Sequence, residues 1–180
     1  MNRSRQFIPV LFLAVFSLSL VPSLGAASSV DAAALQGARA AAADPDATIA
    51  QMLRYAIEDE YLARAEYAVI MAKFGELRPF SNIIRAEESH IAYLRDAFAD
   101  ASLTVPADLA ASRVSAPATL LAAFKAGKQA EIDNIAMYEG FLASPLLAAA
   151  DAAELRALFV RLRDASKNHL RSFENQLSRY

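Results

Sequence analysis

Residues 80–98 read FSNIIRAEESHIAYLRDAF, and this stretch decides the fold class. Its large apolar side chains recur three and four positions apart, as they do on the buried face of an α-helix. Glu87 and His90 fall inside this apolar stripe, and because they are three residues apart they lie side by side on one face. The stretch therefore predicts a core helix that turns a Glu-x-x-His pair inward, with Glu88 at the edge of the stripe.

The same helical periodicity extends over most of the chain, and no segment alternates as a β-strand does. Helix-forming residues dominate the composition, whereas the chain has only 5 Gly and 7 Pro. We therefore expect an all-α fold, a bundle of four helices. The predicted helices span residues 44–74, 79–101, 115–143 and 151–180.

Local signals predict the ends of these helices. Asp44-Pro45 is expected to start the first helix and Gly75 to end it. Ser144-Pro145 breaks the third helix. Asp151 with Glu154 resembles a capping box, which predicts the start of the fourth helix.

Residues 102–116 lack sustained periodicity and are expected to connect the second and third helices. About fifteen extended residues span roughly 50 Å, which exceeds the length of a helix of about 25 residues. The connection is thus long enough to cross the bundle and make these two helices parallel. A plain up-down-up-down order is equally compatible with this length.

The composition excludes several classes of function. A length of 180 residues, 56% of them hydrophobic, suffices for one domain with its own core. A formal net charge of -2 gives no sign of the basic surface that binds nucleic acid. The chain has no cysteine, which excludes disulfides, zinc ribbons and iron–sulfur clusters, so any metal site must use oxygen and nitrogen ligands.

The N-terminus has the pattern of a secretory signal peptide, expected over residues 1–27. Arg3 and Arg5 precede an apolar run, and small residues follow it at 25–27. The run is short for a transmembrane helix, although an uncleaved membrane anchor remains the alternative. We expect a periplasmic or secreted protein, with an Ala-rich linker at 28–43 and a helical domain at 44–180.

Each of the other predicted helices also carries an ionisable residue on its apolar face. Glu60 lies in the middle of the first stripe, Glu131 at the centre of the third and His169 within the fourth. Ser166 shares the fourth stripe, and Asn134 flanks the third. Polar residues therefore face the core near the middle of all four helices.

Buried carboxylates are tolerated when they are paired, protonated or bound to a metal. Three converging carboxylates repel one another unless a cation or shared protons intervene. Glutamate and histidine suit iron, manganese or zinc. The pattern therefore predicts a metal site in the core, and its candidate ligands are Glu60, Glu87, His90, Glu131 and His169.

At these residues the chain resembles the ferritin-like superfamily. It is most similar to an uncharacterised prokaryotic ferritin-like domain of unknown function. Its first helix also resembles the rubrerythrin pattern, with Ala63 and Tyr67 three and seven residues after Glu60. The segments that carry the resemblance are IEDEYLARAEY (57–67), FSNIIRAEESH (80–90), GKQAEIDNI (127–135) and SKNHLRSF (166–173).

The resemblance implies a ferritin-like four-helix bundle with a di-iron carboxylate site, in which the five candidate residues are the metal ligands. A complete set has a second Glu-x-x-His on the fourth helix. Here Ser166 stands three residues before His169, and Asn134 stands where an acidic residue is expected. One metal, or a weak and asymmetric pair, is therefore an alternative to two tightly held ions.

The expected function is an exported protein that binds iron and oxidises it with dioxygen or peroxide. The alternative is a non-catalytic metal-binding or stress-response bundle with an incomplete site. A third interpretation makes the cluster a buried hydrogen-bond network that shares protons. Expected partners are metal ions and no nucleic acid, and a homodimer is left open.

Four further residues near the first and third stripes carry expectations. Tyr67 and Tyr138 lie two turns from the glutamates of their helices, and we expect core aromatics with a hydroxyl partner. Donation to the metal-binding carboxylates, or redox activity, is the alternative. Arg64 is expected to pair with a carboxylate or to lie on the surface, and Glu58 to be solvated.

Overall fold

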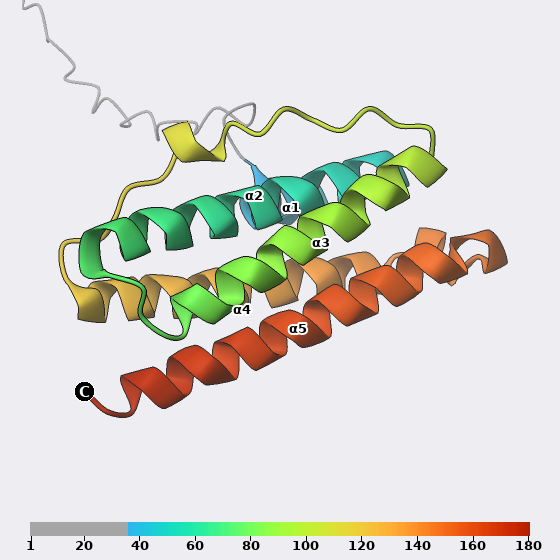
Figure 1. Ribbon diagram of the computed structural model, residues 1–180. Helices are drawn as coiled ribbons and strands as arrows, with labels where there is room; N and C mark the ends of the chain where they lie inside the picture. The colour runs from blue at the N-terminus through green and yellow to red at the C-terminus, as the bar shows by residue number, and fades with distance from the viewer. Residues whose placement is uncertain (1–35) are drawn as a thin grey trace, which may run out of the picture.

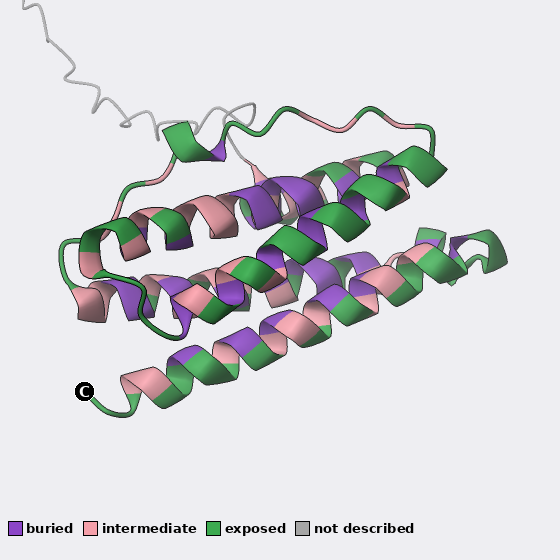
Figure 2. Cartoon of the chain, viewed as in Figure 1, coloured by how far each residue is buried: buried purple, intermediate pink, exposed green. Residues whose placement is uncertain are grey.

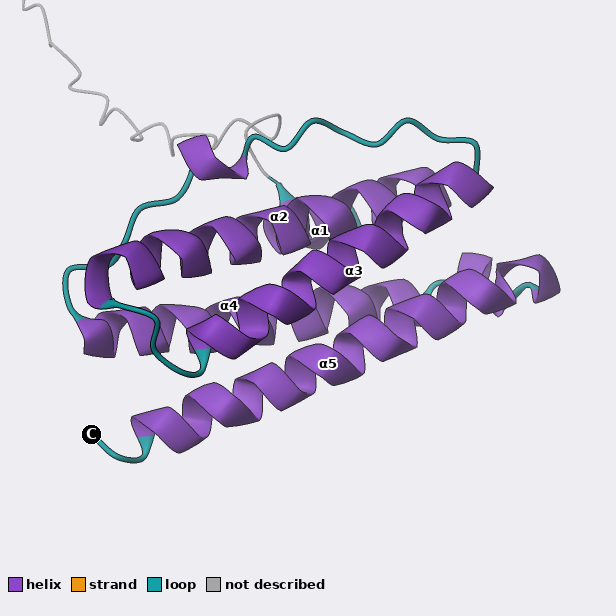
Figure 3. Ribbon diagram, in the orientation of Figure 1, coloured by secondary structure: helices purple, strands orange, loops and turns teal. Residues whose placement is uncertain are grey.

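The computed structural model describes residues 36–180, which contain α-helices, short 3-10 helices and no strand (Figure 3). The predicted all-α fold class is thus confirmed. No helix in this part of the chain has the length and apolar character needed to cross a membrane. The α-helices are α1 (Gly37–Ala42), α2 (Ile49–Phe74), α3 (Phe80–Asp100), α4 (Leu120–Ala143) and α5 (Ala153–Leu177). The 3-10 helices are η2 (Ala110–Ser112), η3 (Pro145–Ala148) and η4 (Ala150–Ala152).

The four long helices form two antiparallel pairs, α2 with α3 and α4 with α5 (Figure 1). The connection after α3 runs back along the length of α2, so α3 and α4 point in the same direction (Figure 1). Arg64 on α2 pairs with Asp108 of the connection, and Ala110 of η2 is buried. The structure therefore has the crossing connection and not the plain up-down-up-down order.

Two helix starts differ from the prediction because the residues expected to cap them do not do so. Thr48, not Asp44-Pro45, caps α2 in a reciprocal capping box with Gln51. Asp44 instead accepts a hydrogen bond from the Gln51 side chain. The predicted capping box of Asp151 and Glu154 is wrong, since η3 and η4 lead directly into α5 and its first residues have no side-chain cap.

Part of the expected linker at 28–43 is folded. Residues 37–42 form α1, which packs against α2 and α4. Gly37 has φ 58°, and a side chain there would collide with Asp59, so the glycine permits this close approach. The buried residues of this helix are one glycine and two alanines. Such small residues form no apolar stripe that the sequence would reveal. The predicted signal peptide, 1–27, and the linker up to residue 35 lie outside the described residues.

The core consists of two apolar clusters on either side of the central polar layer. One is built around Tyr138, Phe159 and Leu94, and the other around Phe80 and Phe173. Along each long helix the buried side chains follow the helical stripe (Figure 2). The glutamates and histidines of the predicted site therefore lie between these two apolar clusters.

Gly127 allows α4 to approach α5 closely at the ring of Phe173. A Cβ on Gly127 would lie 2.4 Å from Phe173 Cζ, and this ring is fully buried. We expect Gly127→Ala to lower the free energy of unfolding by about 1–2 kcal/mol, because overpacking outweighs the roughly 1 kcal/mol gain in helix propensity. Urea denaturation measures the change.

Gly140→Ala is the matched control on the same helix. Gly140 is exposed, and an added Cβ meets nothing within 4 Å. Only the propensity gain then applies, so stability should rise by up to about 1 kcal/mol. Changes of equal sign and size in the two variants would show that the Phe173 contact is not tight.

Candidate metal centre

The structure brings together all five residues that the sequence predicted for the site. They come from the four long helices, and every one is at least nine-tenths buried. They form two overlapping groups of potential ligand atoms, each within 4.8 Å of one another. Glu87 belongs to both groups and lies between them. The groups are Glu60, Glu87 and His90, and Glu87, Glu131 and His169.

The first group is closely hydrogen-bonded around the ring of His90. His90 Nδ1 lies 3.1 Å from Glu60 Oε2 and 2.9 Å from Glu87 Oε2. The other oxygen of Glu60 accepts a hydrogen bond of 2.7 Å from the Tyr138 hydroxyl. This group is therefore a compact set of two carboxylates and one imidazole, and the Tyr138 hydroxyl fixes the orientation of the Glu60 carboxylate.

The second group leaves one buried nitrogen unsatisfied. His169 Nδ1 lies 3.3 Å from Glu87 Oε1 and 3.5 Å from Glu131 Oε1, yet it makes no hydrogen bond to either. Its ring stacks on that of His90, with centroids 5.9 Å apart. A buried ring nitrogen that faces two carboxylates without bonding them suits a shared cation. The donor set of this group thus fits a metal ion.

Two tyrosines donate hydrogen bonds to Glu60 and Glu131, and each tyrosine reaches the glutamate of the opposite helix. Tyr67 of α2 donates a hydrogen bond of 2.8 Å to Glu131 of α4, and Tyr138 of α4 donates to Glu60 of α2. Each tyrosine stands seven residues after the glutamate of its own helix but reaches the glutamate of the other. The expectation of core aromatics with a hydroxyl partner is confirmed, because both rings are fully buried and both hydroxyls donate to glutamates of the candidate site.

The electrostatics of the cluster reflect its burial and its hydrogen bonds. Burial and the neighbouring Glu87 charge raise the pKa of Glu60 to about 7. Burial alone would lower the pKa of each histidine. The hydrogen bonds of His90 to Glu60 and Glu87, together with their charge, raise its pKa to about 10, and the nearby carboxylates of Glu131 and Glu87 raise the pKa of His169 to about 9. Without a metal the histidines are thus cationic at neutral pH and offset the carboxylates.

The residues that depart from the di-iron pattern bond to each other. Ser166 donates a hydrogen bond of 2.7 Å to Asn134 Oδ1, and Asn134 Nδ2 donates one of 2.8 Å to Asp59. Asp59 also accepts from the backbone of Ala38 in α1. Burial raises the pKa of Asp59 to about 7, against these two hydrogen bonds. The network links α1, α2, α4 and α5.

Sequence reasoning missed Asp59 and misjudged Glu58. Glu58 was expected to be solvated, but it is 4% exposed, and its Oε1 accepts a hydrogen bond from Arg54. The outer side of α2 is not free, because η2 packs on this helix and Arg64 pairs with the connection. The pairing of Arg64 with a carboxylate is confirmed. No signal in the sequence marked the partner of Asp59, which lies 75 residues away.

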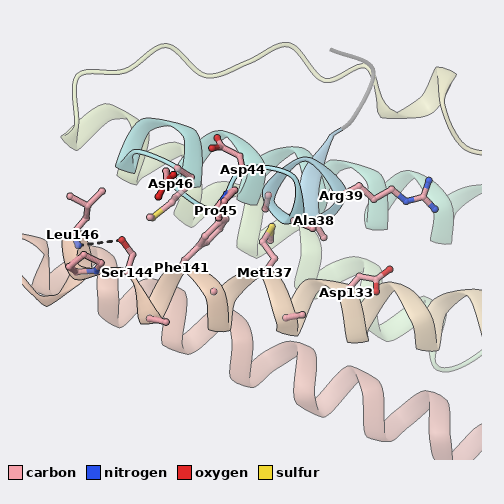
Figure 4. Close-up of a pocket in the computed structure, with 18 residues that line it drawn as sticks. Ala38, Arg39, Asp44, Pro45, Asp46, Asp133, Met137, Phe141, Ser144 and Leu146 are labelled. Atoms are coloured by element: carbon pink, nitrogen blue, oxygen red, sulfur yellow. Dashed lines mark hydrogen bonds between the residues drawn. The ribbon is translucent and has the colours of Figure 1, made fainter. Parts of the chain in front are cut away.

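A separate hollow of about 820 Å³ lies between α1 and the second half of α4 (Figure 4). Met137 and Phe141 line it on the α4 side, and Asp44 and Pro45 line the opposite wall. None of the five candidate ligands is among its lining residues. This hollow is therefore distinct from the cluster of candidate ligands.

No protein-family model matches the chain, and no curated protein matches it. Among solved structures, the chain is similar to the crystal structure of the hypothetical protein MJ0754 from Methanococcus jannaschii DSM 2661. The TM-score is 0.63 at 22% sequence identity, and the match covers 73% of this chain and 80% of that one. The similarity shows a shared fold and carries no information on function.

Proposed function

We propose that this chain is a ferritin-like four-helix bundle whose core binds one or two divalent metal ions, with iron as the preferred metal. The crossing connection and the two antiparallel helix pairs support the bundle assignment. The ligand set comprises Glu60, Glu87, His90, Glu131 and His169.

The unsatisfied Nδ1 of His169 is the observation that carries the proposal. In a hydrogen-bond network that merely shares protons, this buried nitrogen would bond to Glu87 or Glu131. It instead faces both carboxylates at 3.3 and 3.5 Å without bonding either. His169, Glu87 and Glu131 would hold a cation between them, and Glu87 also belongs to the group that would hold a second ion with Glu60 and His90.

The protein's own residues then orient the carboxylates and release protons. Tyr138 donates to Glu60 Oε1 and leaves Oε2 facing His90, whereas Tyr67 donates to Glu131 Oε1, the oxygen that also faces His169. Each hydrogen bond would fix the orientation of its carboxylate for a metal. Metal ions bind neutral imidazole, so loading displaces the protons of His90 and His169. Bound ferrous iron would supply electrons for the reduction of dioxygen or peroxide and become ferric.

A non-catalytic metal-binding role is the second candidate. The observation that favours it is Ser166, which bonds to Asn134 where a second bridging carboxylate would stand. A centre with only one bridging carboxylate holds its second ion less tightly, which suits storage or sensing better than turnover.

Anaerobic loading with ferrous iron tests both candidates. We expect iron to stay bound through desalting and to change oxidation state, seen by absorbance, when dioxygen or hydrogen peroxide is added. Glu88→Gln, an exposed change beside the site, should behave like the parent protein. Iron that stays bound but ferrous contradicts the oxidoreductase and supports the second candidate. Failure to retain iron, manganese or zinc contradicts both.

We further propose that the protein is exported and that its N-terminal signal peptide is removed. The motivation is the charged and apolar N-terminal pattern followed by small residues. N-terminal sequencing of protein from the extracytoplasmic fraction should begin near residue 28. A chain that starts at residue 1 or 2 in the membrane fraction would instead indicate an uncleaved anchor.

A further inference from the structure

A second pocket, of about 490 Å³, leads to the metal-ligand cluster from the side. Its walls come from α2 and α4, and residues of α1 together with Arg113 and Val114 also line it. Glu87 and Glu131 are among the lining residues, although each is only 3% exposed. The pocket therefore reaches Glu87, which belongs to both ligand groups, and Glu131, which belongs to the second group.

Glu131 connects this pocket with the second ligand group. It lines the pocket, and its Oε1 accepts the hydrogen bond from Tyr67. The same oxygen lies 3.5 Å from His169 Nδ1, the buried nitrogen that has no hydrogen-bond partner. The pocket therefore leads to a carboxylate that faces this unsatisfied nitrogen.

Glu66 lines the same pocket, and no earlier part of the site accounts for it. It has no hydrogen bond or ion pair within the part of the chain that the structure describes, and it is half-buried. The nearby charges that act on it are the carboxylate of Glu131 and the guanidinium of Arg39. Glu66 is thus an unpaired carboxylate on the pocket wall, under the influence of Glu131.

The charge of the pocket favours a cation. Carboxylates outnumber guanidinium groups in its lining by five to two, and a carboxylate-lined cleft raises the local concentration of cations. Arg39 is exposed and opposes this attraction. The carboxylates are Asp59, Glu66, Glu87, Glu131 and Asp133, and the guanidinium groups are Arg39 and Arg113.

We propose that this pocket is the route by which divalent cations reach the metal centre, and that Glu66 transfers them from solvent to Glu131. This inference rests on the proposed function, because it assumes that the cluster binds metal. Glu66 is a positioning residue for the incoming ion and not one of its final ligands. Its removal therefore changes the rate of loading and leaves the final occupancy unchanged.

Stopped-flow loading with cobalt(II), followed by its visible absorption, tests the route. Glu66→Gln keeps the shape of the side chain and removes its charge, so we expect loading about fivefold slower with the same final amplitude. Arg39→Gln removes the opposing charge and should speed loading about twofold. Glu88→Gln is the matched control, since Glu88 is an exposed glutamate outside the pocket, and its loading rate should equal that of the parent.

The dependence of the loading rate on salt concentration is an independent measurement, and a purely structural role of Glu66 would not affect it. Rising ionic strength should reduce the difference in loading rate between the parent and Glu66→Gln, because salt screens the charge of Glu66. Equal loading rates for Glu66→Gln and Glu88→Gln would overturn the route and leave the metal centre intact. A lower final amplitude in Glu66→Gln would overturn it too, because Glu66 would then be a ligand. No cobalt binding by the parent protein would overturn both the route and the proposed function.

Discussion

Replacing Glu87 with alanine is expected to remove both proposed metal positions at once. Glu87 contributes one oxygen towards His90 and the other towards His169, so both ligand groups lose a carboxylate. Loss of a directly bound ligand should weaken metal binding more than about 100-fold, beyond the effect of changing a residue that only supports a ligand. Metal analysis after equilibrium dialysis measures the stoichiometry.

Glu131→Ala is the informative comparison, because it disrupts only the second group. Glu60, Glu87 and His90 remain in place, so one metal per chain should still bind. Glu87→Gln keeps the volume of the side chain and serves if the alanine variant folds poorly, which circular dichroism would reveal. Equal stoichiometries in the Glu87 and Glu131 variants would show that Glu87 is not shared.

Addition of a divalent metal to the metal-free protein is expected to raise its Tm by about 8 °C. A ligand that binds only the folded state at 100 times its Kd stabilises that state by about 2.7 kcal/mol, and a domain of this size gains about 3 °C per kcal/mol. Scanning calorimetry with and without manganese(II), which is stable in air, measures the shift. The Glu87→Ala protein should show almost none.

This shift separates the metal centre from a buried network that shares protons. The histidine protons and the tyrosine hydrogen bonds already offset the carboxylates in the metal-free protein. If the cluster is only a network of this kind, added metal would leave the Tm unchanged. An unchanged Tm with manganese(II), iron(II) and zinc(II) would establish that interpretation.

The helical period was sufficient to predict the candidate site residue by residue. Glu87 and His90 were assigned to the core because they interrupt an apolar stripe at helical spacing, and the same reasoning placed Glu60 on its own helix face. The structure buries each of them and brings them together. A period identifies the face of a helix, and residues on the buried faces of long packed helices tend to meet.

What the sequence could not provide were contacts between helices that lie far apart along the chain. Ser166 and Asn134 each looked like a separate defect of the site, but they are hydrogen-bonded to each other. Helix α1 was missed because alanine side chains give no visible stripe even when they are buried. The start of α2 was misplaced because two adjacent capping signals competed, and the Thr48 box was the one formed.

The crossing connection divides the molecule into two helical hairpins that are joined covalently only through residues 101–119. The first hairpin holds Glu60, Glu87 and His90. The second holds Glu131 and His169, which meet the first across the core. A metal bound between Glu87 and these two residues would cross-link the hairpins. In a chain without cysteine, it would do for the fold what a disulfide does elsewhere.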